Sequence, residues 1–167
     1  MTQPGTEYLT STLATFLGLK RDAERALAQV DDDAFFHALD AESNGLAVLI
    51  KHVGGNLRSR WTDFLTADGE KPTRDRDGEF EIGPGDTRER LMAGWEDGWR
   101  TLLGTIERLT PDDLDTKVAI RGESMAAQAA VQRALAHVAQ HVGQIVLLSK
   151  HLAGPGWTTL TIPRRRR

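Results

Sequence analysis

Two histidines four residues apart, His137 and His141, are the side chains of this sequence best suited to act together chemically. Residues at this spacing in a helix lie one turn apart on the same face, so both imidazoles could bind one metal ion. Gln144 extends the same row, and the small side chains of Ala130 and Ala134 leave room beside it for a pocket between helices. The spacing therefore predicts a partly buried pair of metal ligands.

A third histidine, His52, occurs in a segment where small or polar side chains follow one helical face. That strip consists of Gly45, His52, Asn56, Ser59 and Asp63. If it faces the histidine pair, three neutral imidazoles would hold one side of a metal ion and leave positions for water or substrate, as in catalytic sites. The remaining histidines, His37 and His151, have no comparable neighbours, and we expect them at the surface.

The composition limits the other chemistry that is available. The chain has no cysteine, which excludes thiolate ligands and a cysteine nucleophile, so any thiol must come from a cosubstrate. A net charge of -3 gives no broad basic face for nucleic acid. The apolar runs are shorter than the roughly 20 residues that cross a bilayer, and no secretory signal is visible at the N-terminus. We therefore expect a cytoplasmic protein with neither a nucleic-acid nor a membrane partner, and a solvated basic tail at 164–167.

Apolar residues at helical spacing predict the elements that position the histidines. The expected helices cover residues 7–30, 43–66, 86–109 and 124–152, with Asp86 and Ser124 as N-caps of the last two. Residues 117–120 are expected to be a short extended piece. The predicted fold class is all-α, an up-and-down four-helix bundle that forms a single domain over residues 1–167.

A loop of unusual length, residues 70–85, connects the second and third predicted helices, and loops of this length are often functional. Asp75, Asp77 and Gly78 resemble part of an EF-hand calcium loop. Aligning Gly78 with the invariant glycine of that loop places Thr73 first and Pro84 last, where carboxylates are required, so the calcium interpretation is rejected. Residues 74–81 are instead interpreted as a charged segment that borders the histidine site.

Other polar and aromatic residues leave alternatives open. Arg60 falls within the apolar arc of its helix, where it either pairs with Asp63 or Glu42 or binds substrate. No carboxylate accompanies the histidines at a fixed spacing, so a general base is not identified, and Glu123 is the nearest candidate. Four tryptophans either line a ligand cleft or pack in the core, and their spacing favours the core: Trp61, Trp95, Trp99 and Trp157.

Two stretches of sequence surround all three histidines and carry a resemblance to a known family. These are KHVGGN at residues 51–56, continuing into RSRW at 58–61, and AHVAQHVGQI at 136–145. They resemble the DinB/YfiT-like superfamily. The sequences DGEKP at 68–72, RGE at 121–123 and LTIP at 160–163 are similar to an uncharacterised bacterial branch of it, so the resemblance covers nearly the whole chain.

The resemblance implies an up-and-down four-helix bundle, often a homodimer, that binds zinc or nickel through His52, His137 and His141. Members of the superfamily include transferases and isomerases that use low-molecular-weight thiols such as bacillithiol and mycothiol, and proteins regarded as metal-dependent hydrolases. The leading hypothesis is a metal-dependent S-transferase or hydrolase for a small-molecule substrate, in which the ion activates a thiol or water. Four further residues would either orient the substrate or hold the metal ligands in position by contacting them: Asn56, Arg60, Glu123 and Gln144. The alternative is a non-catalytic stress or scaffold protein with a structural metal, which a fourth protein ligand would favour.

Overall fold

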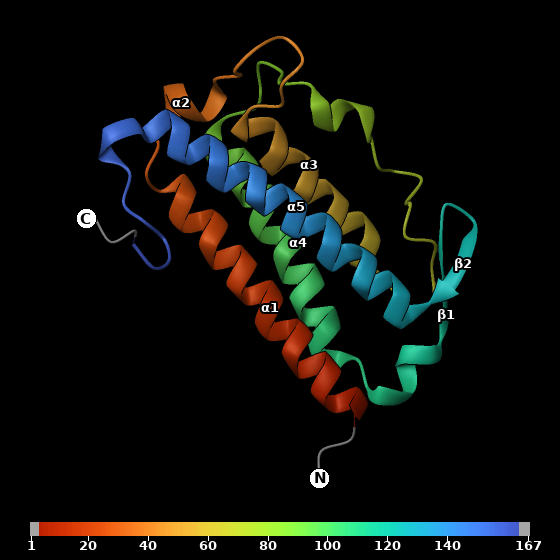
Figure 1. The fold of residues 1–167 in the computed structure, drawn as a ribbon. Coiled ribbons are helices and arrows are strands. Elements are labelled where there is room, and N and C mark those ends of the chain that lie inside the picture. Colours follow the sequence, from red (N-terminus) through yellow and green to blue (C-terminus); the bar gives the residue numbers. More distant parts are fainter. Residues whose placement is uncertain (1–3, 164–167) are drawn as a thin grey trace.

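The computed structural model describes residues 4–163 and is mostly helical. Four long helices lie side by side, and a short helix and a small hairpin are attached at their ends (Figure 1). The long helices are α1 (Pro4–Leu27), α3 (Leu46–Trp61), α4 (Arg88–Arg108) and α5 (Ala127–Ala153). The smaller elements are α2 (Asp32–Phe36), three 3-10 turns (Asp77–Phe80, Pro111–Asp115 and Gly154–Gly156) and the strands β1 (Lys117–Ile120) and β2 (Glu123–Ala126).

Helices α3 and α4 run in the same direction (Figure 1). Near their first turns, Lys51 Nζ donates to the Asp86 carboxylate at 2.8 Å, and near their last turns Thr105 Oγ1 donates to the Trp61 carbonyl at 3.1 Å. The alternating up-and-down order expected from the sequence is therefore wrong for this pair. The reason is the long connection, residues 62–87, here called the crossover, which returns along α3 so that α4 starts beside the start of α3.

The second helix ends earlier than the apolar pattern predicts. It begins after Gly45 and ends at Trp61 instead of near residue 66, because Thr62 is extended and Asp63 has a left-handed backbone with φ of 50°. Phe64 is still buried and stacks on Trp61 with ring centroids 4.5 Å apart. An apolar side chain at helical spacing thus continues the buried stripe after the helix has ended.

Two other helix ends differ from the expected ones. Helix α1 stops at Leu27, and Asp31, expected only to follow it, accepts a backbone hydrogen bond that caps α2. Thr87, not Asp86, caps α4 by accepting from the Arg90 amide at 3.2 Å. The Asp86 carboxylate instead binds Lys51 of α3.

The last helix starts after a hairpin that the sequence analysis missed. The expected extended piece is confirmed as β1, but Ser124, predicted to cap the helix, pairs with Ala119 in an antiparallel ladder. Arg121 and Gly122 form the two-residue turn with φ values of 56° and 76°, the positive angles that such hairpin turns require. Helix α5 consequently begins at Ala127.

The core between the long helices contains three of the four tryptophans expected to pack there, whereas Trp157 is only partly buried. Trp95 and Trp99 are fully buried and meet edge to face at 5.4 Å, and Trp61 is buried beside Phe64. No helix within residues 4–163 is long and apolar enough to cross a membrane.

The C-terminal segment is only partly packed. Trp157 and Leu160 lie against the core, whereas Ile162 is 90% exposed. The predicted basic tail at 164–167 lies outside the described residues.

Helices α3 and α4 touch through glycines, which allows a matched test of their contact. A Cβ added to Gly98 would lie 2.5 Å from the Gly54 carbonyl oxygen, whereas one added to Gly94, a turn earlier on α4, would meet nothing within 4 Å. Gly98→Ala should lower the free energy of unfolding by about 2 kcal/mol because the helices must separate. Gly94→Ala should raise it by about 0.5–1 kcal/mol by restricting the unfolded chain. Urea denaturation of both variants checks this, and equal effects would contradict the close contact.

Candidate metal centre

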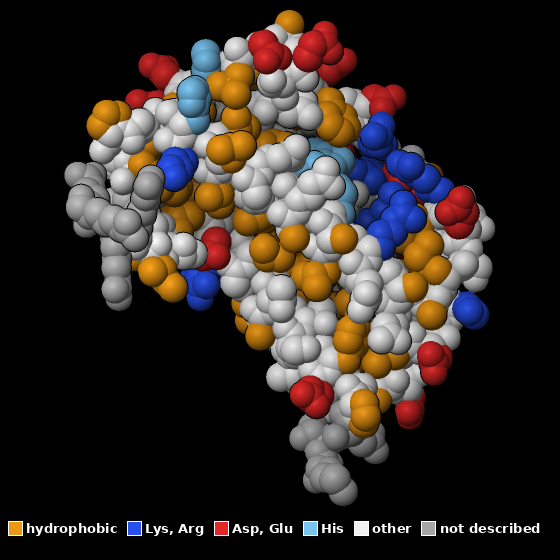
Figure 2. Space-filling model, in the orientation of Figure 1, with side chains coloured by type: hydrophobic (Ala, Val, Ile, Leu, Met, Phe, Trp, Pro, Cys, Tyr) orange, Lys and Arg blue, Asp and Glu red, His pale blue; other side chains and the backbone are white. Residues whose placement is uncertain are grey.

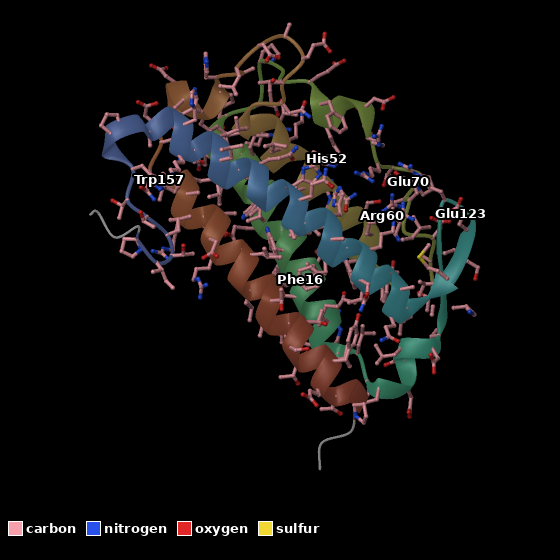
Figure 3. The ribbon with its side chains drawn as sticks, viewed as in Figure 1. Phe16, His52, Arg60, Glu70, Glu123 and Trp157 are labelled. Carbon is pink, nitrogen blue, oxygen red and sulfur yellow. The ribbon has the colours of Figure 1, made fainter. Side chains whose placement is uncertain are left out.

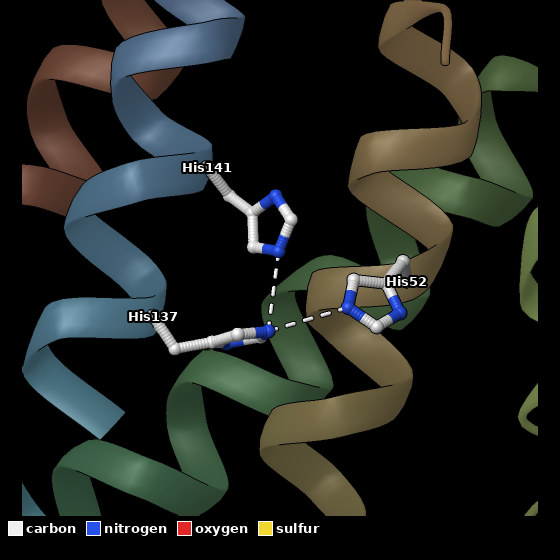
Figure 4. A group of neighbouring side chains, drawn as sticks. All are labelled: His52, His137 and His141. Atoms are coloured by element: carbon white, nitrogen blue, oxygen red, sulfur yellow. Dashed lines mark hydrogen bonds between the residues drawn. The ribbon is translucent and has the colours of Figure 1, made fainter. Parts of the chain in front are cut away.

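Three histidine side chains meet between α3 and α5 (Figure 4). His52 projects from α3, and His137 and His141 project from successive turns of α5. His137 Nε2 lies 3.3 Å from His52 Nε2 and 3.1 Å from His141 Nε2. One ligand atom from each of the three lies within 4.8 Å of the others, so the group could hold a metal ion.

The separations between these nitrogens fit a shared ion. Ligands about 2.0–2.1 Å from zinc are about 2.9 Å apart at right angles and about 3.4 Å apart at the tetrahedral angle. The two measured separations, 3.1 Å and 3.3 Å, fall between these limits. A proton on His137 Nε2 could be donated to His52 Nε2 or to His141 Nε2 but not to both at once. A cation bound between the three nitrogens would relieve the repulsion among all three lone pairs.

A buried carboxylate fixes the orientation of His52. Glu79 Oε2 lies 2.9 Å from His52 Nδ1, and both side chains are buried. Burial alone would raise the pKa of Glu79, but hydrogen bonds from His52 and Arg74 outweigh it and lower that pKa. The ionised carboxylate can only accept, so His52 Nδ1 carries a proton, and in the neutral imidazole the lone pair of Nε2 is directed toward the other histidines. Gly55 leaves room for this carboxylate, because a Cβ there would collide with Glu79.

Burial and a hydrogen bond set the protonation of the two histidines of α5. Gln144 Oε1 lies 2.8 Å from His141 Nδ1, which places the proton on Nδ1 and the lone pair on Nε2. Burial, together with the imidazoles of His141 and His52, lowers the pKa of His137 to about 4. Burial also lowers the pKa of His141, although the hydrogen bond to Gln144 opposes this. Both imidazoles are thus neutral near pH 7, as metal ligands must be.

The crossover supplies a network of arginines and carboxylates behind the histidines. Arg74, buried in the crossover, donates to both oxygens of Glu79 at 2.7 Å and lies 3.3 Å from Glu70. Glu70 also accepts from Arg60 at 2.8 Å and from Arg121 of the hairpin turn at 2.9 Å. Arg60 therefore pairs with Glu70, not with Asp63 or Glu42 as the structural alternative supposed. The network joins α3, the crossover and the hairpin around the site.

A cavity of about 360 Å³ lies directly beside the three histidines. In the space-filling view, pale-blue histidine atoms lie in a hollow bordered by blue arginine and lysine side chains (Figure 2). The cavity is lined by His52, Asn56, Arg60, Trp61, Phe64, Gly69, Arg74, Arg76, Phe80, Ala119, Ile120, Arg121, Ala130, Arg133, Ala134, His137, Gln140 and His141. A substrate in the cavity would therefore contact both the histidines and the charged network.

The structure brings most of the predicted site residues together but not all. Asn56 and Arg60 line the cavity, and Gln144 contacts His141 from behind. Glu123 does not line the cavity. It is exposed on β2, because the hairpin separates it from the start of α5, and it lies at the edge of the molecule while Arg60 and Glu70 lie inward of it (Figure 3). His37 and His151 are exposed, as predicted.

Sequence reasoning missed Glu79, Arg74 and Glu70 as individual residues. Arg74 and Glu79 fall within residues 74–81, the segment interpreted as a charged stretch bordering the site, and Arg74, Arg76 and Phe80 do line the cavity. Glu70 lies outside that segment. No spacing rule relates Glu79 to His52, because the two are 27 residues apart and meet only through the path of the crossover.

Asp68 ties the crossover to the hairpin turn and should make stability depend on acid pH. It accepts from the amides of Glu70, Gly122 and Arg121 at 2.7–2.9 Å, and these hydrogen bonds lower the pKa of Asp68 to about 2. A depressed carboxyl pKa stabilises the fold above the unfolded pKa of about 4, and this contribution is lost as the pH falls toward 2. Asp68→Asn should therefore be less stable than wild type at pH 6, by a margin that shrinks between pH 4 and pH 2. Urea denaturation across this range measures the margin, and a margin independent of pH would contradict the role of the charge.

Comparison with known proteins gives one match. The model of a family described as protein of unknown function (DUF1572) matches residues 3–166. Neither a curated protein nor a solved structure matches the chain significantly.

Proposed function

The chain belongs to the DUF1572 family, whose function is unknown, and from its site we propose that it is a metal-dependent enzyme. The ion, zinc or nickel, is held by His52, His137 and His141. The observation that carries the proposal is the convergence of three imidazole nitrogens beside a cavity. Glu79 and Gln144 hold two of these ligands in the tautomer that binds metal.

The open side of the histidine group favours catalysis over a structural metal. Structural zinc sites are closed by four protein ligands, whereas catalytic sites use three and keep one position for water or substrate. Within residues 4–163, the metal-binding group contains three side chains of the usual ligand types. Its fourth side is next to the cavity, where a small molecule can reach the ion.

The chemistry we propose is S-transfer or hydrolysis on a small-molecule substrate. A divalent ion in this position lowers the pKa of a thiol or water and polarises an electrophile near neutral pH. Because the chain has no cysteine, the thiol of an S-transfer must be a low-molecular-weight cosubstrate. Asn56 and Arg60 line the cavity and orient the substrate, while Gln144 acts through His141. Residues of the crossover and of the hairpin line the cavity beside the site.

The wider setting of the site is proposed on the resemblance to the DinB/YfiT-like superfamily. The four long helices form a four-helix bundle in which α3 and α4 run in the same direction, in one domain over residues 1–167, and two copies form a homodimer in the cytoplasm. The histidine-bearing stretches of α3 and α5, which carry the resemblance, are also the stretches that meet in the site.

Turnover by the metal-loaded protein tests this proposal against the scaffold alternative. Zinc- or nickel-loaded protein is incubated with bacillithiol, mycothiol or glutathione and a panel of electrophiles, and separately with an ester panel. We expect metal-dependent turnover of at least one pair and its loss on addition of a chelator. Absence of turnover across both panels, with metal removal lowering only the melting temperature, would support the non-catalytic scaffold instead.

A further inference from the structure

The cavity beside the histidines is strongly basic. Five arginines line it, and no aspartate or glutamate among the described residues does: Arg60, Arg74, Arg76, Arg121 and Arg133. They come from α3, the crossover, the hairpin turn and α5, so positive charge surrounds the cavity on several sides. A cavity walled by one sign of charge focuses the electrostatic field and attracts ligands of the opposite sign.

The neighbouring carboxylates neutralise only part of this charge. Glu70 is shared by three of the arginines, and Glu79 is shared between Arg74 and His52. Arg133 forms no ion pair with any residue between 4 and 163, and the Asp77 carboxylate that meets Arg76 is almost fully exposed. The buried Glu79 and the half-buried Glu70 thus balance five guanidinium groups at close range, and a divalent ion at the histidines would add two further positive charges.

Two buried donors on the cavity wall lack an acceptor. Arg60 Nη2 binds Glu70, but Arg60 Nη1 has no hydrogen-bond partner among the described residues, and neither has Trp61 Nε1. Buried donors without a partner are uncommon and costly. Burial lowers the pKa of Arg60, and the adjacent charges of Arg74 and Arg121 add to this effect although Glu70 opposes it. An acceptor that carries negative charge would relieve both the missing hydrogen bonds and the crowding of positive charge.

Part of the remaining cavity wall is apolar. This part includes Trp61 at the end of α3, Phe64 just after it, Ile120 of the hairpin, and Ala130 and Ala134 of α5. The two alanines lie one and two turns before His137 on α5, so this apolar surface leads toward the histidines. A ligand that fills the cavity must therefore carry an apolar part as well as a charge.

We propose that the cavity binds a small organic anion, a carboxylate or phosphate joined to an apolar group. Its charged end lies at Arg60, Arg133 and the Trp61 Nε1 donor, its apolar part lies against Phe64 and the alanines of α5, and its reactive part faces the histidines. Only the orientation of the reactive part rests on the proposed metal-dependent function, because the arginines do not require the ion.

Binding of three matched probes tests the charge requirement. Zinc-loaded protein is titrated calorimetrically with 3-phenylpropanoate, its neutral amide and phenyl phosphate. Charge-assisted hydrogen bonds are worth about 1.5–3 kcal/mol each, so at least one anion should bind about 10- to 100-fold more tightly than the amide. The tighter of the two anions identifies the charged group as carboxylate or phosphate. An amide that binds as tightly as both anions would overturn the proposal.

Variants assign the effect to the cavity arginines. Arg60→Gln and Arg133→Gln should each weaken binding of the preferred anion about tenfold or more. Arg133 is exposed and unpaired among the described residues, so its variant should fold even if loss of Arg60 disturbs Glu70. Arg21→Gln on α1, away from the cavity, is the matched control and should leave binding unchanged. If Arg21→Gln weakens binding as much as the other two, the proposal fails.

The same titrations with chelator-treated His137→Ala, without added zinc, separate this inference from the metal proposal. If the anion binds to the ion and not to the arginines, the variant without an ion binds the anion no more tightly than the amide. Substitution of Arg60 or Arg133 then has no further effect on binding, and the arginine site is refuted. If the dependence persists in protein that binds no metal, the arginine site is supported independently of the ion. Wild type that binds metal but shows no preference for an anion leaves the metal centre intact and removes only this inference.

Discussion

Alanine in place of Glu79 is expected to lower the free energy of unfolding of the metal-free protein by about 3 kcal/mol. Removing one partner of a buried ion pair costs about 3–5 kcal/mol, because the remaining charge stays buried without compensation. Here the remaining charge is that of Arg74, whose side chain is only 4% exposed. Arg74 keeps a contact with Glu70 at 3.3 Å, which is why we expect the lower end of the range.

The same variant should also weaken metal binding, by about 10- to 100-fold, because His52 loses the acceptor that fixes its tautomer and ring orientation. Chemical denaturation of chelator-treated protein gives the first effect, and a competition titration with zinc gives the second. Glu81→Ala is the control: its carboxylate is exposed two residues away, and its effect should stay within about 0.5 kcal/mol. A Glu79 variant as stable as the Glu81 variant would show that the pair with Arg74 contributes little.

Replacing His137 by alanine should weaken zinc or nickel binding by about 100- to 1000-fold. Zinc sites with four ligands bind with apparent free energies of about 10–16 kcal/mol, or about 2.5–4 kcal/mol for each ligand. His137 is the central member of the group, since its Nε2 is within 3.3 Å of both other Nε2 atoms. Its loss would leave two ligands on opposite helices without the one between them.

His151→Ala provides the control for this measurement, because His151 lies on the same helix but is exposed near its end. Its affinity for zinc should equal that of wild type in the same competition titration. Equal losses in the two variants would mean that metal binds through scattered surface imidazoles, and unchanged affinity in His137→Ala would remove this residue from the site.

The histidine group was predictable because its members lie on long amphipathic helices. The spacing of His137 and His141 is enough to place them on one helix face. The small and polar residues around His52, together with the resemblance of both histidine-bearing stretches to the DinB/YfiT-like superfamily, identified His52 as the third member. The structure brings these three side chains together, while metal binding itself stays a prediction. A helix keeps its periodicity regardless of its neighbours, so residues on one face can be related without knowing the tertiary structure.

What the sequence could not supply are contacts made by irregular segments. The direction of α4 and the pairing of Glu79 with His52 both depend on the path of the crossover. The crossover has no periodic pattern of apolar residues from which that path could be predicted. The hairpin depends on Asp68 binding the turn amide of Gly122 from 54 residues away. Such polar contacts between distant residues determine where α5 begins and why Glu123 lies outside the site.

The most direct measurement of the central claim is the metal content of wild-type protein purified without chelator. Inductively coupled plasma mass spectrometry should find about one equivalent of zinc, nickel or a similar divalent ion per chain, and dialysis against a chelator followed by zinc should restore one equivalent. Protein that carries no such ion and takes up none on reloading would contradict the metal centre at His52, His137 and His141.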